Sequence, residues 1–174
     1  MEEREWAAAA CQGDETAFYH LVSSQKRKLY GIAFSYLRNE SDALDAVQET
    51  VCKAWLKCRQ LKEPDAFIPW LIRILIHVCI DEQKRRKRTL PLTALTQPAS
   101  GEMVSVHKLD LEIAMERLKP KYRHVLTLKY YQDMTLTEIA RILDRPEGTV
   151  KTWLHKGLKQ LRGQMTWGGE VYYG

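Results

Sequence analysis

The chain is poor in residues that interrupt helices and in side chains that commonly bind metals. Its 174 residues include only nine glycines, six prolines, five histidines and four cysteines. The glycines and prolines fall between segments with helical periodicity, and no sustained period-two alternation indicates a β-strand. There is no metal-ligand cluster, phosphate-binding glycine loop or nucleophile motif, so an enzyme such as a nuclease has little support. The sequence therefore predicts an all-α protein that is not an enzyme and needs no cofactor.

Long apolar runs are missing as well. No stretch approaches the roughly 18 uninterrupted apolar residues that a membrane-spanning helix needs. The N-terminus, MEEREWAAAACQGDE, is acidic where a signal peptide is basic. We therefore expect a cytoplasmic protein with no direct membrane insertion.

The cysteines, all in the first half of the chain, form no C-x-x-C pair. In a cytoplasmic protein we expect them to be free thiols. Cys58 and Cys79 fall on apolar helix faces and are predicted to be small core residues. A zinc site combining Cys52, Cys58 or Cys79 with His77 is an alternative, but its spacing resembles no usual site, and we predict no bound metal.

Helical periodicity covers most of the chain and divides it into two parts. The expected helices span Glu3–Cys11, Glu15–Leu37, Ser41 to about Cys58, Ala66 to about Arg86, Leu109–Leu118 and Tyr122–Tyr131. The segment between the helix that ends near Arg86 and the helix that begins at Leu109, TLPLTALTQPASGEMVSVH (89–107), has the composition of a linker. The sequence thus predicts two small helical domains, 1–88 and 109–167, a flexible linker at 89–108 and a tail at 168–174.

The helix expected after Ser41 has two distinct faces. Its apolar stripe consists of Leu44, Val47, Val51, Trp55 and Cys58. Its outer stripe consists of Asp42, Asp45, Gln48, Glu49 and Cys52. An acidic stripe cannot face DNA, so it is either solvated or docks on a protein.

Two cationic features suit a polyanionic partner, which the net charge of +5 permits. The run Lys84-Arg85-Arg86-Lys87-Arg88 ends a predicted helix. Bases there complement the helix dipole, but five in succession exceed that need and favour binding to backbone phosphates.

The second cationic feature is a helix-turn-helix pattern in residues 135–162, TLTEIARILDRPEGTVKTWLHKGLKQLR. Thr135 and Glu138 form a capping box for a short helix, and Pro146 opens the next one. The outer face of that second helix carries Thr149, Lys151, Thr152, His155, Lys156 and Lys159. Such a face suits the DNA major groove, although a lysine-bearing face is often just solvated.

Three segments together resemble regions 2 and 4 of an extracytoplasmic-function (ECF) sigma factor, the smallest type in the sigma-70 family. They are LYGIAFSYLRNESDALDAVQETVCKAW (29–55), DAFIPWLIRILIHVCIDEQKRRKR (65–88) and EIARILDRPEGTVKTWLHKGLKQLR (138–162). Their order matches the family, with a short linker in place of region 3. The resemblance implies a protein that binds core RNA polymerase, recognises the −35 and −10 promoter elements and promotes DNA melting.

The resemblance also implies roles for individual residues. In the family, the acidic helix face binds the β′ clamp helices of the polymerase, which implicates Asp42, Asp45, Gln48 and Glu49; the β flap is the other expected polymerase contact. The residues implied for the unpaired −10 strand are Leu61, Lys62 and His77 around a flipped base, and Arg73, Lys84, Arg85, Arg86 and Arg88 on phosphates. The residues implied for the −35 duplex are Thr149, Lys151, Thr152, His155, Lys156 and Lys159.

Family members are usually silenced by a membrane-anchored anti-sigma factor, so the resemblance implies one here, able to hold the protein at the membrane. The sequence also departs from the family pattern. Many relatives have Arg at positions 153 and 156, Asn at 77 and Ala at 157, where this chain has Trp153, Lys156, His77 and Gly157. Lysine lacks the planar guanidinium of arginine, so these positions do not predict which promoter sequence is recognised.

The alternative function is a stand-alone helix-turn-helix regulator whose N-terminal domain senses a ligand or dimerises. Such a regulator binds operator duplex by itself. The acidic 42–49 stripe together with the 84–88 basic run favours the sigma factor, because a ligand-sensing domain has no use for this pair of surfaces.

Overall fold

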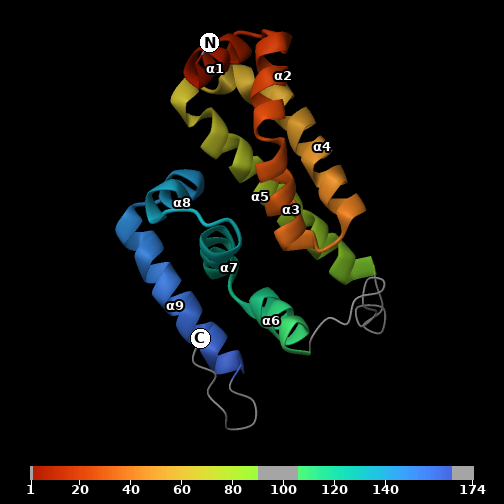
Figure 1. The fold of residues 1–174 in the computed structure, drawn as a ribbon, viewed down its shortest axis with the longest axis vertical. Coiled ribbons are helices and arrows are strands. Elements are labelled where there is room, and N and C mark those ends of the chain that lie inside the picture. Colours follow the sequence, from red (N-terminus) through yellow and green to blue (C-terminus); the bar gives the residue numbers. More distant parts are fainter. Residues whose placement is uncertain (1, 90–105, 166–174) are drawn as a thin grey trace.

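The structure, a computed structural model, describes residues 2–89 and 106–165, and every regular element in these ranges is helical (Figure 1). The helices of the first half are α1 (Glu3–Cys11), α2 (Glu15–Ser24), α3 (Lys26–Leu37), α4 (Glu40–Lys57), the 3-10 turns η1 (Cys58–Gln60) and η2 (Pro64–Ala66), and α5 (Phe67–Thr89). The helices of the second half are α6 (Val106–Arg117), α7 (Pro120–Leu126), the π-helical turn η4 (Thr127–Tyr131), α8 (Leu136–Leu143) and α9 (Glu147–Met165). The predicted all-α fold is confirmed.

The first predicted helix is confirmed, but the prediction of one helix over Glu15–Leu37 is wrong. The chain breaks at Gln25, whose backbone (φ −98°, ψ 0°) caps both α2 and α3. The Gln25 N–H donates to the Val22 carbonyl at 3.1 Å, a tighter turn than an α-helix makes. Because of this break, α2 packs against α1 while α3 packs against α4 and α5. Neither proline nor glycine marks the position, so the sequence pattern did not reveal it.

Helix α4 begins two residues earlier and buries a different face than the sequence predicts. Asn39, and not Ser41, is the N-cap: its side chain accepts a 2.9 Å hydrogen bond from the Asp42 N–H. The buried residues of α4 are Ala43, Ala46, Thr50 and Ala54. Leu44, predicted to be core, is 44% exposed, while Val47, Val51 and Trp55 are partly buried. Small side chains face α3 and α5 because they allow these helices to approach closely.

The cysteine predictions hold where the structure tests them. Cys58 and Cys79 are buried, and all four cysteines are free. Burial, assisted by Glu49 and Glu82, raises the pKa of the Cys79 thiol to about 12, so this thiol stays protonated. Within residues 2–89 and 106–165, no three His, Cys, Asp or Glu side chains are grouped as metal ligands. Over the same ranges, no helix is long and apolar enough to cross a membrane.

The helix-turn-helix forms as the sequence predicts. Thr135 and Glu138 make the capping box: the Glu138 N–H donates to Thr135 Oγ1 at 3.2 Å, and the Thr135 N–H to Glu138 Oε2 at 2.8 Å. Asp144, with φ 54°, ends α8 in the left-handed conformation. Pro146 lies just before α9 and its carbonyl accepts from the N–H groups of the first turn.

The two halves of the chain pack directly against one another. Helix α8 lies against α5, and η4 lies against α3 (Figure 1). Leu71 and Leu75 of α5 belong to the same buried cluster as Ile139 and Ile142 of α8. The boundaries predicted at 88, 108 and 167 remain a prediction. Residues 90–105 of the predicted linker and the predicted tail lie outside the described residues.

Gly157 is where α9 meets α7 most closely. A Cβ atom at this position would lie 3.1 Å from Tyr122 Cβ and 3.3 Å from Leu126 Cδ1. The Tyr122 contact is with the rigid base of a side chain, so α7 itself would have to move. This close approach accounts for the glycine at position 157.

We expect Gly157→Ala to lower the free energy of unfolding by about 1 kcal/mol, because overpacking outweighs the helix propensity that alanine adds. Gly148→Ala, in the same helix, is the matched control, since nothing lies within 4 Å of a Cβ there. That variant should be neutral or slightly stabilised. Thermal and urea unfolding measure both; equal stability of the two variants would contradict the packing argument.

Candidate protein and nucleic-acid interfaces

The solvent-facing side of α4 combines acidic and apolar groups. Asp45 and Gln48 are exposed and make no hydrogen bond or ion pair with a described residue, whereas Glu49 pairs with Lys53 at 2.8 Å. Leu44 and Leu56 lie on this same face, and Leu56 is 78% exposed. Sequence analysis missed these leucines as surface groups: Leu44 was assigned to the core, and the pattern did not single out Leu56. Acids around exposed apolar side chains are typical of a surface that binds protein.

Asp42, predicted to belong to that surface, instead pairs with a residue of the basic run. Its carboxylate forms an ion pair with Arg86 and is partly buried. Arg86 also donates to the Leu37 carbonyl at 3.0 Å and lies 3.7 Å from Glu82. Burial lowers the pKa of Arg86, but the guanidinium stays charged. Arg86 therefore ties α5 to the α3–α4 connection, and this role competes with phosphate binding.

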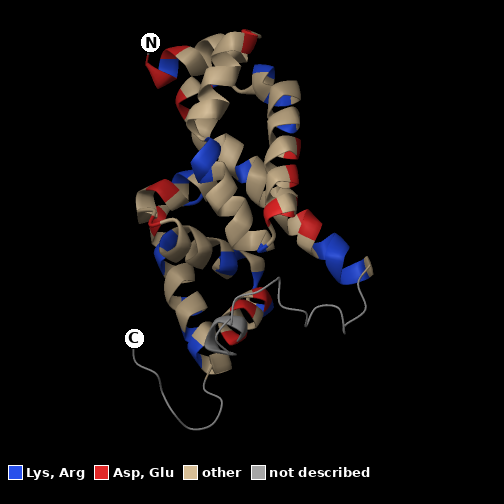
Figure 2. Cartoon of the chain, turned by 45° about the vertical axis from the view of Figure 1, so that its right-hand side comes forward, with Lys and Arg blue, Asp and Glu red and all other residues tan. Residues whose placement is uncertain are grey.

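The rest of the basic run projects into solvent at the end of α5 (Figure 2). Lys84, Lys87 and Arg88 are exposed. Arg85 is exposed too and pairs with Glu82 at 2.7 Å, a bond that raises the pKa of Arg85. These side chains form an exposed cationic surface of the kind that contacts phosphates.

The predicted −10 residues lie at separate places in the first half. Lys62 is exposed, and Leu61 is partly buried after η1, where its N–H donates to the Cys58 carbonyl at 3.1 Å. His77 is exposed on α5. No hydrogen bond or ion pair between described residues joins Lys62 to His77. The role of these residues at a flipped base remains a prediction.

Arg73 makes contacts that the sequence did not indicate. Its Nε donates to the Ile142 carbonyl at 2.7 Å, and its Nη2 to the Arg141 carbonyl at 3.2 Å. These carbonyls belong to the last turn of α8, where a cation is favoured by the helix dipole. Arg141 in turn donates to the Asp65 carbonyl at 3.1 Å. In this arrangement Arg73 joins the two halves and is not available to DNA.

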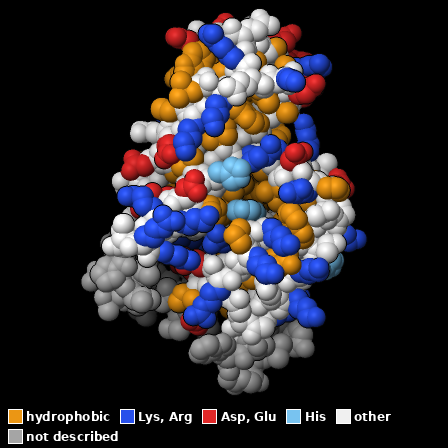
Figure 3. Space-filling model, turned by 180° about the vertical axis from the view of Figure 1, so that it is seen from behind, with side chains coloured by type: hydrophobic (Ala, Val, Ile, Leu, Met, Phe, Trp, Pro, Cys, Tyr) orange, Lys and Arg blue, Asp and Glu red, His pale blue; other side chains and the backbone are white. Residues whose placement is uncertain are grey.

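The outer face of α9 is open to solvent. Its exposed members are Lys151, Thr152, His155, Lys156 and Lys159. Thr149 is partly buried in the first turn, and Val150 beside it is fully buried as the anchor of the helix. Figure 3 shows Lys and Arg side chains gathered over α9 and over the end of α5 on the same side of the molecule. The described surface thus carries two separate cationic areas on one face.

A polar contact between the halves is centred on His124. Tyr36 Oη lies 2.8 Å from His124 Nδ1, and burial raises the pKa of Tyr36, so the hydroxyl donates and the ring nitrogen accepts. Burial, then the nearby Arg123 and His77, lower the pKa of His124 to about 4. Gln132 adds a 3.1 Å hydrogen bond to Ser35. The Tyr36 contact requires a neutral His124, because a protonated Nδ1 cannot accept the hydroxyl.

We expect acidification to weaken this contact. A folded pKa of about 4 for His124 against an ordinary 6.5 means that the unfolded chain binds the extra proton. The stabilisation is complete above pH 6.5 and is lost as the pH falls toward 4; between pH 7.5 and 5 the loss is about 2 kcal/mol. Urea unfolding at several pH values measures it. His124→Gln, which cannot titrate, should flatten this dependence, and an unchanged slope in that variant would contradict the assignment.

Comparison with known families agrees with this geometry. The family model described as sigma-70 region 2 matches residues 21–89, and the one described as sigma-70 region 4 matches residues 108–161. Together they cover more than half of the chain, and they fall on the two packed halves. These matches define the class: a sigma factor of the sigma-70 family.

Individual relatives narrow the class. RNA polymerase sigma factor SigV of Bacillus subtilis is 32% identical over 83% of this chain and 89% of the relative. ECF RNA polymerase sigma factor SigW of the same organism is 32% identical, and the match covers 88% of this chain and 91% of SigW. The solved structure of CnrH, in complex with the cytosolic domain of CnrY, matches with a TM-score of 0.67 and 25% identity over 92% of this chain and 95% of that one. RpoE of Bartonella quintana shares the fold, with a TM-score of 0.58 and 20% identity. The match covers 87% of this chain and 98% of RpoE.

The chain belongs to the extracytoplasmic-function sigma factors of the sigma-70 family. It is an RNA polymerase sigma factor that initiates transcription, and it is not an enzyme. Sigma factors bind core RNA polymerase, and region 4 provides DNA binding.

Proposed function

We propose that the exposed face of α4 is the surface that binds core RNA polymerase, at the β′ clamp helices, with the β flap as a second polymerase contact. The observation that carries the proposal is the combination of free acids and exposed leucines on this face. Asp45 and Gln48 have no partner among the described residues, and Glu49 pairs only with the neighbouring Lys53. Leu44 and Leu56 supply apolar area that an isolated domain would bury.

The two cationic areas are proposed to divide promoter recognition between them. Region 4 reads the −35 duplex through the exposed face of α9, with Lys156 and Thr152 at base edges and Thr149, Lys151, His155 and Lys159 nearby. Region 2 holds the unpaired −10 strand through Leu61, Lys62 and His77, and Lys84, Arg85 and Arg88 bind its phosphates. The support is that nearly all of these side chains are exposed and that the two areas lie on different halves.

Binding to a promoter requires a rearrangement of the structure described here. Arg73 is held by the carbonyls of Ile142 and Arg141, so its proposed phosphate contact needs region 4 to leave α5. Arg86 remains paired with Asp42, a contact within region 2 that opening does not disturb. Polymerase binding is proposed to supply the free energy for separating the halves.

An anti-sigma factor is the proposed regulatory partner. Among the similar structures, CnrH was solved with the cytosolic domain of CnrY, and RpoE with the anti-sigma factor NepR. By analogy with the first of these, we propose that this sigma factor works in the cytoplasm and is held at the membrane by such a partner.

Run-off transcription with core polymerase, in the presence and absence of this protein, tests the proposal. The template carries a candidate promoter selected from genomic fragments by the reconstituted holoenzyme. Promoter-dependent transcripts are expected only when both components are present. Tight, sequence-specific binding of duplex DNA by the protein alone, with no effect on polymerase, would contradict it.

A further inference from the structure

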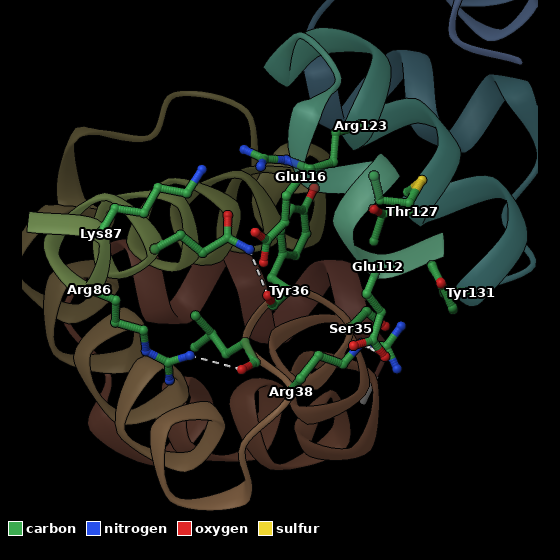
Figure 4. Close-up of a pocket in the computed structure, with 13 residues that line it drawn as sticks. Ser35, Tyr36, Arg38, Arg86, Lys87, Glu112, Glu116, Arg123, Thr127 and Tyr131 are labelled. Carbon is green, nitrogen blue, oxygen red and sulfur yellow. Dashed lines mark hydrogen bonds and ion pairs between the residues drawn. The ribbon is translucent and has the colours of Figure 1, made fainter. Parts of the chain in front are cut away.

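A cavity lies between region 2 and region 4, next to the basic run at the end of α5, and none of the proposed polymerase-binding residues lines it (Figure 4). Its volume is about 160 Å³, far more than the roughly 15 Å³ that one water molecule needs. Tyr36 and Lys87 line it from region 2, and Arg123 and Thr127 line it from region 4. We call this space the junction cavity. A ligand bound there would touch both halves at once.

Arg123 is the unusual member of the lining. Its side chain is only 8% exposed, and its Nε is shielded from solvent without a hydrogen-bond partner. The guanidinium makes no ion pair with any described residue. Burial lowers the pKa of Arg123, but an arginine of this kind stays protonated. A buried cation without a partner is costly, because the lost hydration is not replaced.

Two carboxylates, Glu112 and Glu116, also line the cavity, but neither forms an ion pair with Arg123. Glu112 forms an ion pair with Arg38, with 3.6 Å between Oε1 and Nε. Glu116 is close enough to raise the pKa of Arg123, but its side chain is exposed and forms no ion pair within the described residues. On the other side of the cavity Lys87 is exposed and likewise unpaired. Two unpaired cations therefore face the space, one deeply buried and one at its edge.

Neutral hydrogen-bonding groups complete the lining. Gln83 donates to the Tyr36 carbonyl at 2.6 Å, and its Oε1 is shielded and without a partner. Thr127 is buried and lines the cavity, and its hydroxyl also interacts with Tyr36. A guanidinium, an ammonium and a hydroxyl around one small cavity are the groups that bind a tetrahedral oxyanion.

We propose that the junction cavity binds a phosphate group, either as inorganic phosphate or as the terminal group of a small phosphorylated metabolite, and that this ligand holds regions 2 and 4 together. The ligand supplies the missing partner of Arg123 and contacts both halves. It therefore favours the packed arrangement, in which Arg73 is occupied by α8. This effect on transcription depends on the proposed function, whereas the binding itself does not.

Thermal unfolding of the full chain tests the site. The probes are inorganic phosphate, pyrophosphate and a nucleoside diphosphate, each compared with chloride at the same ionic strength and pH 7.5. Binding in large excess over the dissociation constant should raise Tm by about 5 °C. The probe with the largest shift distinguishes free phosphate from a phosphorylated metabolite.

Variants assign the shift to the cavity. Arg123→Met should raise Tm without any anion, because an unpaired buried charge is removed, and should abolish the shift. Lys87→Met, an exposed position that leaves folding intact, should reduce the shift at least several-fold. Lys84→Met, in the same basic run but outside the cavity, should keep it. An absence of any shift with all three probes would overturn the proposal. So would a shift that survives in Lys87→Met or disappears in Lys84→Met, since the anion would then bind the surface run.

Discussion

Charge reversal at Asp45 and Glu49 to lysine is expected to abolish co-purification with core RNA polymerase and to eliminate run-off transcription. Opposing like charges across an interface cost several kcal/mol, so the affinity should fall about 100-fold or more. The fold should survive, because both side chains point away from Ala43, Ala46 and Ala54, which form the buried face of α4. Pull-down with purified core enzyme and circular dichroism of the variant measure the two effects.

A matched control separates this surface from net charge. Glu3→Lys with Glu15→Lys changes the charge of the chain by the same amount at two exposed positions on α1 and α2. That variant should bind polymerase as the unmodified protein does. Unchanged affinity in the α4 variant would refute the assignment of this face. Equal loss in both variants would show that only the overall charge matters.

Lys156→Ala is expected to relax discrimination at the −35 element by about one to two powers of ten. A good contact to a base edge discriminates by about 1–3 kcal/mol, and Lys156 is exposed on the outer face of α9. Competition binding of holoenzyme to promoters with single substitutions in the −35 element measures the change. Lys159→Ala on the same face is the comparison, since a phosphate contact weakens all sequences about equally.

His77→Ala should affect a different step. It should leave −35 binding intact and reduce the permanganate-reactive bubble at the −10 element, because His77 lies on α5 and is not part of the outer face of α9. A template with the −10 region already mismatched should restore part of the loss, since unpairing then costs no free energy. Weaker −35 duplex binding in His77→Ala, or a melting defect alone in Lys156→Ala, would contradict the division between the two regions.

Local sequence signals were sufficient for much of the fold. The capping box of Thr135 and Glu138, the start of α9 at Pro146 and the outer face of α9 all depend on residues within four positions of one another. The family resemblance added the expected order of regions 2 and 4, which the comparisons confirm. Such features are predictable because the interactions that produce them are short-range.

The buried face of α4 was not predictable in the same way. Hydrophobic spacing favoured Leu44 and its neighbours, yet the helix buries Ala43, Ala46 and Ala54. Close packing against α3 and α5 selects small side chains over large ones, and the larger side chains are then free for a partner. The same long-range packing decides that Gly157, rather than alanine, fits against Tyr122.

The sequence by itself determined the helix-turn-helix of the second half, the basic run, the acidic stripe and the family of this protein. Only the tertiary structure decided that Arg73 bonds to the end of α8, that Arg86 pairs with Asp42, and that Arg123 is buried without a partner. The physical reason is the same in each case. A side chain's charge and helical face are encoded locally, but its partner is chosen by segments that lie tens of residues away in the chain and meet only in the folded protein.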